Sequence, residues 1–122
     1  MNSQKKKITF DSYTRPNGRN EFELWLLTLS IKDKAKLLSI MESIEEHGLL
    51  IARQMHWVDK LDDNLFEIRS KFGSNTQRAL YFHVHNHSFI ITHGFTKKTQ
   101  KTPKGEMEKA KKIRSEYYDE IK

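Results

Sequence analysis

Apolar and charged side chains alternate along Leu65-Phe66-Glu67-Ile68-Arg69-Ser70-Lys71-Phe72. This alternation has the two-residue period of a β-strand that is buried on one face only. Phe66, Ile68 and Phe72 then point one way, and Glu67, Arg69 and Lys71 point the other way. The stretch therefore predicts a sheet with one apolar face and one face that carries charge.

The segments around this strand predict a small α+β fold. Two further strands follow it and form a three-stranded antiparallel meander with it. A first strand and two helices precede the meander, and we expect the two helices to form a helical hairpin. A last helix closes the chain, and the sheet is antiparallel or mixed. The predicted additional strands are 5–14, 78–85 and 89–95, and the predicted helices are 21–29, 31–47 and 103–121.

Capping residues mark where the predicted helices begin and end. Asn20 and Ser30 are expected N-caps, because short polar side chains accept hydrogen bonds from the first free N–H groups of a helix. Gly48 is the expected C-terminal stop of the second helix. Thr102 is expected to cap the last helix, with Pro103 at the first helical position.

Length and composition predict one soluble domain. The 122 residues fit a single domain over 1–122, in which we expect residues 1–6 to be frayed. Cysteine is absent, so disulfides and thiolate metal sites are excluded, and a reducing cytoplasm is compatible. No window approaches the roughly 20 apolar residues of a membrane span, and no secretory signal follows Met1. We therefore expect a cytoplasmic protein without a membrane partner.

Positive charge is concentrated in one part of the chain. The formal net charge is +6, and residues 97–114 hold eight Lys or Arg against two Glu. Such an excess favours an anionic partner, either nucleic acid or an acidic protein surface. A solvated, lysine-rich helix is an equally good explanation when charge alone is considered.

The charged face of the sheet is the expected functional surface. If the helices cover the other face, Arg69 and Lys71 lie on an open surface that Arg78, His93 and Lys97 can join. Guanidinium and ammonium groups match a phosphate. For Arg69 the alternative is an ion pair with Glu67 or Asp59, and for His93 it is a histidine that is satisfied at a strand end.

These residue types suit cleavage of RNA without a metal. The 2′-hydroxyl can attack the phosphorus if a group accepts its proton and if cations neutralise the developing charge. His93 has a suitable ordinary pKa and is the favoured proton handler. Lys97 is an alternative base if neighbouring cations lower its pKa, while Arg69 and Arg78 stabilise charge. Trp57 either stacks on a base or covers the core.

Three closely spaced histidines raise the question of a metal site. His83, His85 and His87 share a strand-like spacing, but no carboxylate or fourth ligand stands at a recognisable spacing from them. We therefore expect neither a metal nor a small-molecule cofactor.

Four motifs resemble a known family. They are Lys60-Leu61, Leu65-Phe66-Glu67-Ile68-Arg69, Gln77-Arg78-Ala79-Leu80-Tyr81-Phe82 and His93-Gly94-Phe95-Thr96-Lys97-Lys98-Thr99-Gln100-Lys101-Thr102-Pro103. Together with Ala110 and Tyr117, they make residues 60–117 similar to the phage-derived, HigB-like toxins of the RelE/ParE superfamily.

The resemblance implies a specific activity. Such toxins have a fold like that of microbial RNases and cleave mRNA in the ribosomal A site, and a helix-turn-helix antitoxin (HigA-like) neutralises them. It implies a metal-independent endoribonuclease whose partners are mRNA, the ribosome and that antitoxin. The implied catalytic residues are Arg69, Arg78, His93 and Lys97, and the implied RNA-binding residues are Lys60, Lys71, Lys98 and Lys101.

Two other functions remain open. A ParE-like toxin of the same fold would bind a protein such as DNA gyrase and cut no RNA. A nucleic-acid-binding module without toxicity would bind RNA with a steep salt dependence.

Overall fold

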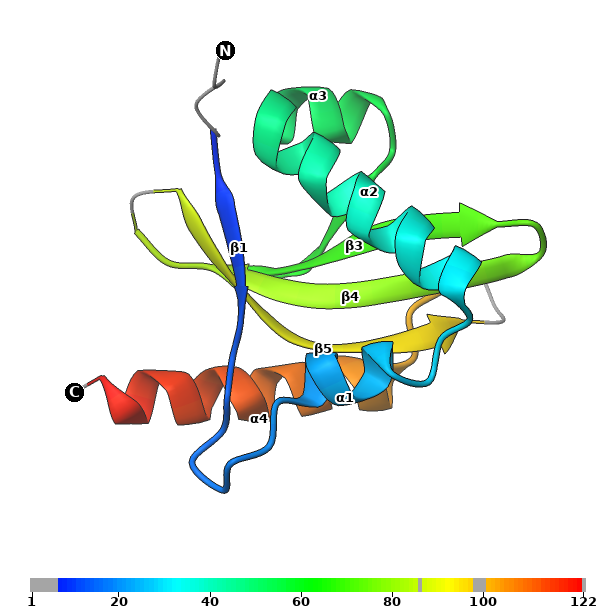
Figure 1. The fold of residues 1–122 in the computed structure, drawn as a ribbon. Helices are drawn as coiled ribbons and strands as arrows, with labels where there is room; N and C mark the ends of the chain where they lie inside the picture. The colour runs from blue at the N-terminus through cyan, green and yellow to red at the C-terminus, as the bar shows by residue number, and fades with distance from the viewer. Residues whose placement is uncertain (1–6, 86, 98–100, 122) are drawn as a thin grey trace, which may run out of the picture.

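Within the part of the chain that the structure describes, five strands form one mixed sheet in the order β1-β5-β4-β3-β2 (Figure 1). The computed structural model of the protein describes residues 7–85, 87–97 and 101–121. β1 runs parallel to β5, and the other neighbouring strands are antiparallel. The strands are β1 (Thr9–Ser12), β2 (Val58–Asp62), β3 (Leu65–Phe72), β4 (Asn75–His83) and β5 (Ser88–Lys97). The predicted α+β fold with a mixed sheet is confirmed.

The edge strand β2 was not predicted. In its sequence Val58-Asp59-Lys60-Leu61-Asp62, only Val58 is buried. The apolar and polar residues therefore do not alternate in a way that predicts a strand. It forms because it pairs with β3, and its register shifts between Lys60 and Asp62. Pairing rather than pattern therefore determines this strand.

Four helices in the described ranges flank the sheet. The N-caps Asn20 and Ser30 are confirmed, because their side chains accept hydrogen bonds from the N–H groups of Glu23 and Asp33. Thr102 is not the N-cap of the last helix; Pro103 takes that position and Thr102 bonds elsewhere. The helices are α1 (Glu21–Leu26), α2 (Ile31–His47), α3 (Leu49–Gln54) and α4 (Lys104–Glu120).

The predicted helical hairpin is wrong in its packing. α1 packs on β5, whereas α2 packs on β3 and on α3, a helix that the sequence did not predict. Trp25 of α1 lies directly over Gly94 of β5, and a Cβ atom at Gly94 would stand 2.2 Å from the indole. The absence of a side chain at Gly94 therefore allows α1 to approach the sheet. Trp25 is partly buried and packs against the main core.

Helices cover both faces of the sheet, so the expectation of one free face is corrected. α2 and α3 lie on one side of the sheet and α4 runs along the other (Figure 1). The main core fills the first interface. A smaller core joins Ala110 of α4 to Leu65, Leu80 and Phe95. The part of the charged face that α4 leaves uncovered carries Arg69, which is half-buried, and Lys71, which is exposed.

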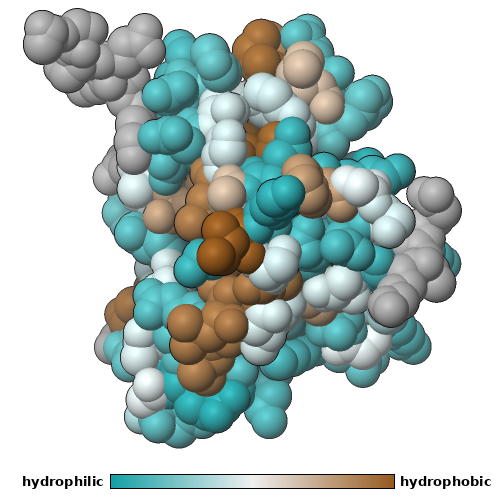
Figure 2. All heavy atoms as spheres, turned by 45° about the vertical axis from the view of Figure 1, so that its right-hand side comes forward, coloured by the Kyte–Doolittle hydropathy of each residue, from teal (hydrophilic) through white to brown (hydrophobic). Residues whose placement is uncertain are grey.

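The surface combines charge with an apolar band. Figure 2 shows a strip of apolar side chains between hydrophilic ones on the side that carries the α1–α2 junction. Leu27 and Ile31 at that junction are 77% and 85% exposed. None of the helices in the described part of the chain has the length and hydropathy to cross a membrane.

Candidate nucleic-acid site

The buried carboxylate of Glu67 is the centre of the site. Glu67 lies on β3 on the face of α4 and is 1% exposed. Its Oε2 accepts hydrogen bonds from Arg69 Nε at 3.1 Å and from Arg78 Nη1 at 2.5 Å. Its Oε1 accepts a hydrogen bond from the hydroxyl of Thr102 at 2.6 Å. One carboxylate therefore positions two guanidinium groups and the segment that leads into α4.

The two arginines are brought together by strand register. Arg69 of β3 stands directly opposite Arg78 of β4, a pairing of like charges that is unfavourable by itself. Glu67 offsets this repulsion from two residues away on the same face, and Asp59 of β2 adds an ion pair of 3.0 Å to Arg69 Nη2. The alternative partners considered for Arg69, Glu67 and Asp59, are therefore both present.

Lys97 stands beside these arginines at the end of β5. It is 5% exposed, and burial lowers the pKa of its ammonium group. The positive charges of Arg78 and Arg69 lower that pKa further, against the opposing effect of Glu67 and Asp59. Lys97 thus loses its proton more easily than an ordinary lysine.

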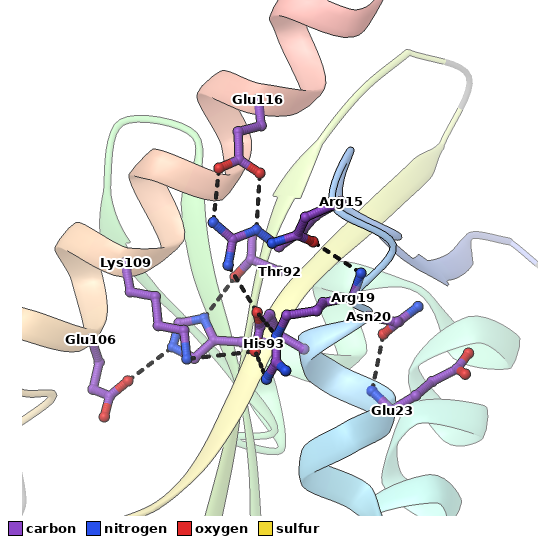
Figure 3. Close-up of polar contacts among 11 residues, drawn as sticks. Arg15, Arg19, Asn20, Glu23, Thr92, His93, Glu106, Lys109 and Glu116 are labelled. Atoms are coloured by element: carbon purple, nitrogen blue, oxygen red, sulfur yellow. Dashed lines mark hydrogen bonds and ion pairs between the residues drawn. The ribbon is translucent and has the colours of Figure 1, made fainter.

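His93 shares the face of this cluster but lies beneath α4 (Figure 3). It is 1% exposed, its Nε2 lies 2.9 Å from Glu106 Oε1, and its Nδ1 lies 3.1 Å from the hydroxyl of Thr92. Burial lowers the pKa of its ring, and Lys109 lowers it further, while the hydrogen bond to Glu106 raises it. The expected convergence of His93 with the arginines on an open surface is therefore corrected.

A bulge in β5 explains the orientation of His93. Ile91 pairs with Tyr81 and His93 pairs with Leu80, so Thr92 is an extra residue between two consecutive pairs. In a regular strand, His93 would point to the same face as Ile91, which lies two residues before it. The bulge turns His93 toward α4, where a ring contact with Phe95 at 6.0 Å between centroids encloses it further.

Ion pairs around His93 hold α4 to the rest of the protein. Arg15, from the loop that follows β1, binds Glu116 of α4 at 2.8 Å (Figure 3). It also binds Glu21 of α1 at 2.8 Å. The hydrogen bond from Arg19 lowers the pKa of Glu21, and the bond from Arg15 adds to this effect, so that the pKa falls to about 2. This second cluster joins the loop after β1 to α1 and α4.

The predicted RNA-binding lysines fall in different places. Lys71 is exposed on the face of Arg69, and Lys101 is exposed next to Thr102. Lys60 pairs with Phe66, so its side chain leaves the sheet on the opposite face from Glu67. The structure therefore does not bring Lys60 to the cluster. Lys98 and residues 1–6 lie outside the described residues.

A cavity of about 370 Å³ opens next to the arginines, between α2 and the edge of β3. His56 and Trp57 form part of its wall. The cations that line it are Lys36, Arg69, Lys71 and Arg78.

Lys36 and His56 were not predicted as site residues, since only the placement of α2 and of the turn before β2 brings them to β3. The central role of Glu67 was signalled only by its alternation with Arg69.

Comparison with protein families identifies the family of this chain. The model of the family described as Phage derived protein Gp49-like (DUF891) matches residues 24–115. The chain belongs to the Gp49-like family. The match includes Glu67, Arg69, Arg78 and Lys97, so the site of this Gp49-like protein lies within the family domain. No curated protein matches the chain. The Gp49-like family is RelE-like, which agrees with the broader part of the resemblance seen in the sequence.

Proposed function

We propose that this Gp49-like protein is the toxin of a type II toxin–antitoxin pair and cleaves mRNA on the ribosome. The observation that carries the proposal is the cluster of Arg69, Arg78 and Lys97 around the buried carboxylate of Glu67. Cations held in place before substrate binds need no reorganisation when charge develops on a phosphate. The adjoining cationic cavity gives an RNA strand a surface to follow.

The chemistry requires no metal. Lys97 in its neutral form accepts the proton of the 2′-hydroxyl, whose oxygen then attacks the neighbouring phosphorus. The bond to the 5′-oxygen breaks, and this leaving oxygen takes a proton from water, so the products are a 2′,3′-cyclic phosphate and a free 5′-hydroxyl. Arg69 and Arg78 neutralise the charge on the non-bridging oxygens.

His93 has a different role in this proposal. Its burial beneath α4 keeps its ring away from a phosphodiester, so we assign the proton transfer to Lys97. His93 is a positioning residue that fastens β5 to Glu106 in the first turn of α4.

The proposed partners are the ribosome with its mRNA and a helix-turn-helix antitoxin. The net charge of +6 favours approach to ribosomal RNA. The exposed Leu27 and Ile31 offer a protein partner apolar surface of the kind that association covers.

Induction of the gene without its neighbouring antitoxin gene tests the proposal. We expect growth arrest, with codon-phased cuts in transcripts when their ends are mapped by primer extension. Arg69→Ala should relieve the arrest while the protein stays folded by circular dichroism. The control Lys112→Ala, an exposed cation of α4, should arrest growth like the parent. A DNA-damage response without cuts would replace the proposal by the ParE-like function, and free expression without arrest would refute toxicity.

A further inference from the structure

We propose that the cavity between α2 and the edge of β3 binds one nucleotide of an RNA substrate, with Trp57 stacked on its base. The inference deepens the proposed function, on which its choice of substrate class rests. The cavity has a volume of about 370 Å³, which lies at the lower end of the range for small-ligand sites.

The cavity exists because β2 is shorter than β3. β2 begins at Val58, opposite Ile68, and the last backbone contact before it is the hydrogen bond from the N–H of Arg69 to the carbonyl of Trp57 at 2.7 Å. Beyond that bond, β4 is the one strand among the described residues that pairs with β3. His56, with φ of 61°, turns the chain sharply just before Trp57. A gap is left at the sheet edge, and α2 closes its far side with Lys36 and Ile40.

The lining of the cavity is cationic. Four of its side chains are Lys or Arg, and no carboxylate stands among the described residues that line it. The cations come from α2, β3 and β4, so three elements direct positive charge to one place. A ligand that carries phosphate is the match for such a site.

Two buried polar atoms in the wall of the cavity have no hydrogen-bond partner among the residues that the structure describes. They are Ser70 Oγ and Arg78 Nε, in residues that are 4% and 6% exposed. An unpaired buried donor is unfavourable, and native proteins satisfy nearly all such groups. A nucleotide that enters the cavity brings phosphate and sugar oxygens to the residues that carry these two atoms.

Trp57 supplies the contact for a base. Its ring is partly buried against the main core, and the same residue lines the cavity together with Lys36 and Arg69. Packing of Trp57 against the core does not by itself explain the cations that lie next to it. An indole beside phosphate-binding cations is the arrangement by which proteins hold single-stranded nucleic acid, and stacking on such a ring contributes about 1–3 kcal/mol per base.

Trp57 fluorescence gives a readout that does not depend on cleavage. The chain has two tryptophans, so Trp25→Phe leaves Trp57 as the single reporter. We expect saturable quenching on titration with a short oligoribonucleotide, and little quenching with inorganic phosphate alone. Lys36→Ala should weaken binding and reduce the salt slope by about one, as expected for loss of one phosphate contact. Lys112→Ala is the matched control on α4, away from the cavity.

Trp57→Leu measures the stacking contribution itself. Loss of 1–3 kcal/mol corresponds to binding that is weaker by roughly 5- to 150-fold. If Trp25→Phe fails to fold, 5-fluorotryptophan in the parent chain gives two resonances, and the one lost in Trp57→Phe is followed instead.

The outcomes separate the two proposals. RNA binding that leaves the Trp57 signal unchanged, or equal quenching by phosphate alone, overturns the nucleotide site. Ribosome-dependent cleavage by Trp57→Leu at the parent rate and with the parent KM also overturns it, and leaves the proposed nuclease standing. Quenching that depends on Lys36 in a protein that cuts no mRNA supports the site and refutes the nuclease.

Discussion

The hydroxyl of Thr102 donates a hydrogen bond of 2.6 Å to Oε1 of Glu67, 35 residues away along the chain. Both residues are buried, with Thr102 7% exposed. The bond ties the start of the segment that leads into α4 to the carboxylate that holds Arg69 and Arg78. The position of α4 and the geometry of the arginines are therefore coupled.

Thr102→Val should lower the free energy of unfolding by about 1.5–3 kcal/mol, because a buried bond to a charged acceptor is lost. Urea denaturation measures this. Thr102→Ser, which keeps the hydroxyl, should regain most of the loss. Equal stability of the valine and serine variants would show that the hydrogen bond contributes nothing.

Gly94→Ala should destabilise the protein by about 1–3 kcal/mol, because the new methyl group would overlap the indole of Trp25. Thermal unfolding of the purified variant gives the size of the effect. Gly105→Ala in the first turn of α4 is the control; a Cβ atom there meets nothing within 4 Å, and alanine favours a helix. We expect that variant to match or slightly exceed the parent. A Gly94→Ala variant as stable as the parent would mean that α1 does not lie as close to β5 as the structure shows.

The free energy of unfolding should fall in two separate pH ranges as the solution is acidified. The folded pKa of His93 lies below its ordinary 6.5, so the unfolded chain takes up this proton first and stability falls as the pH drops below about 6.5. The folded pKa of Glu21 is about 2, against an ordinary 4.5, so its stabilisation is complete above 4.5 and is lost between 4.5 and 2.

Urea unfolding at a series of pH values tests this order. His93→Gln should flatten the upper stage, and Glu21→Gln should flatten the lower one. A parent stability that is constant from pH 7 to pH 3 would contradict both assignments.

The rate of cleavage should depend on pH through Lys97. Only its neutral form accepts a proton, so the single-turnover rate should rise about tenfold per pH unit up to a plateau at its pKa, which lies below 10.5. A plateau reached already below pH 7 would assign the base to a histidine such as His93 instead. Lys97→Met should remove the pH-dependent rise while leaving RNA binding measurable.

Local pattern was enough to predict β3 and its charged face. The alternation from Leu65 to Phe72 gives the bounds of β3 as the structure has them and places Glu67 and Arg69 on one side. The starts of two helices were also predicted, because the side chains of Asn20 and Ser30 accept hydrogen bonds from N–H groups three residues away. These features depend on contacts within a few residues.

Features that depend on tertiary contacts were not predicted. The burial of His93 follows from a bulge at Thr92 and from the docking of α4, and neither leaves a periodic signal. Lys36 reaches the site only because α2 packs on β3. Thr102 was predicted to cap α4 because its neighbour Pro103 favours the start of a helix. Its hydroxyl instead donates a hydrogen bond to Glu67.

The most direct test of the central claim uses purified protein and ribosomes that carry a defined mRNA codon in the A site. We predict a cut within that codon, a 2′,3′-cyclic phosphate on the upstream fragment, and a rate that falls by about 100-fold or more in Arg69→Ala. Lys112→Ala should cut at the parent rate. An mRNA that stays intact while the folded protein is bound to the ribosome would refute the nuclease activity. Equal cutting by the parent and by Arg69→Ala would refute the role of Arg69.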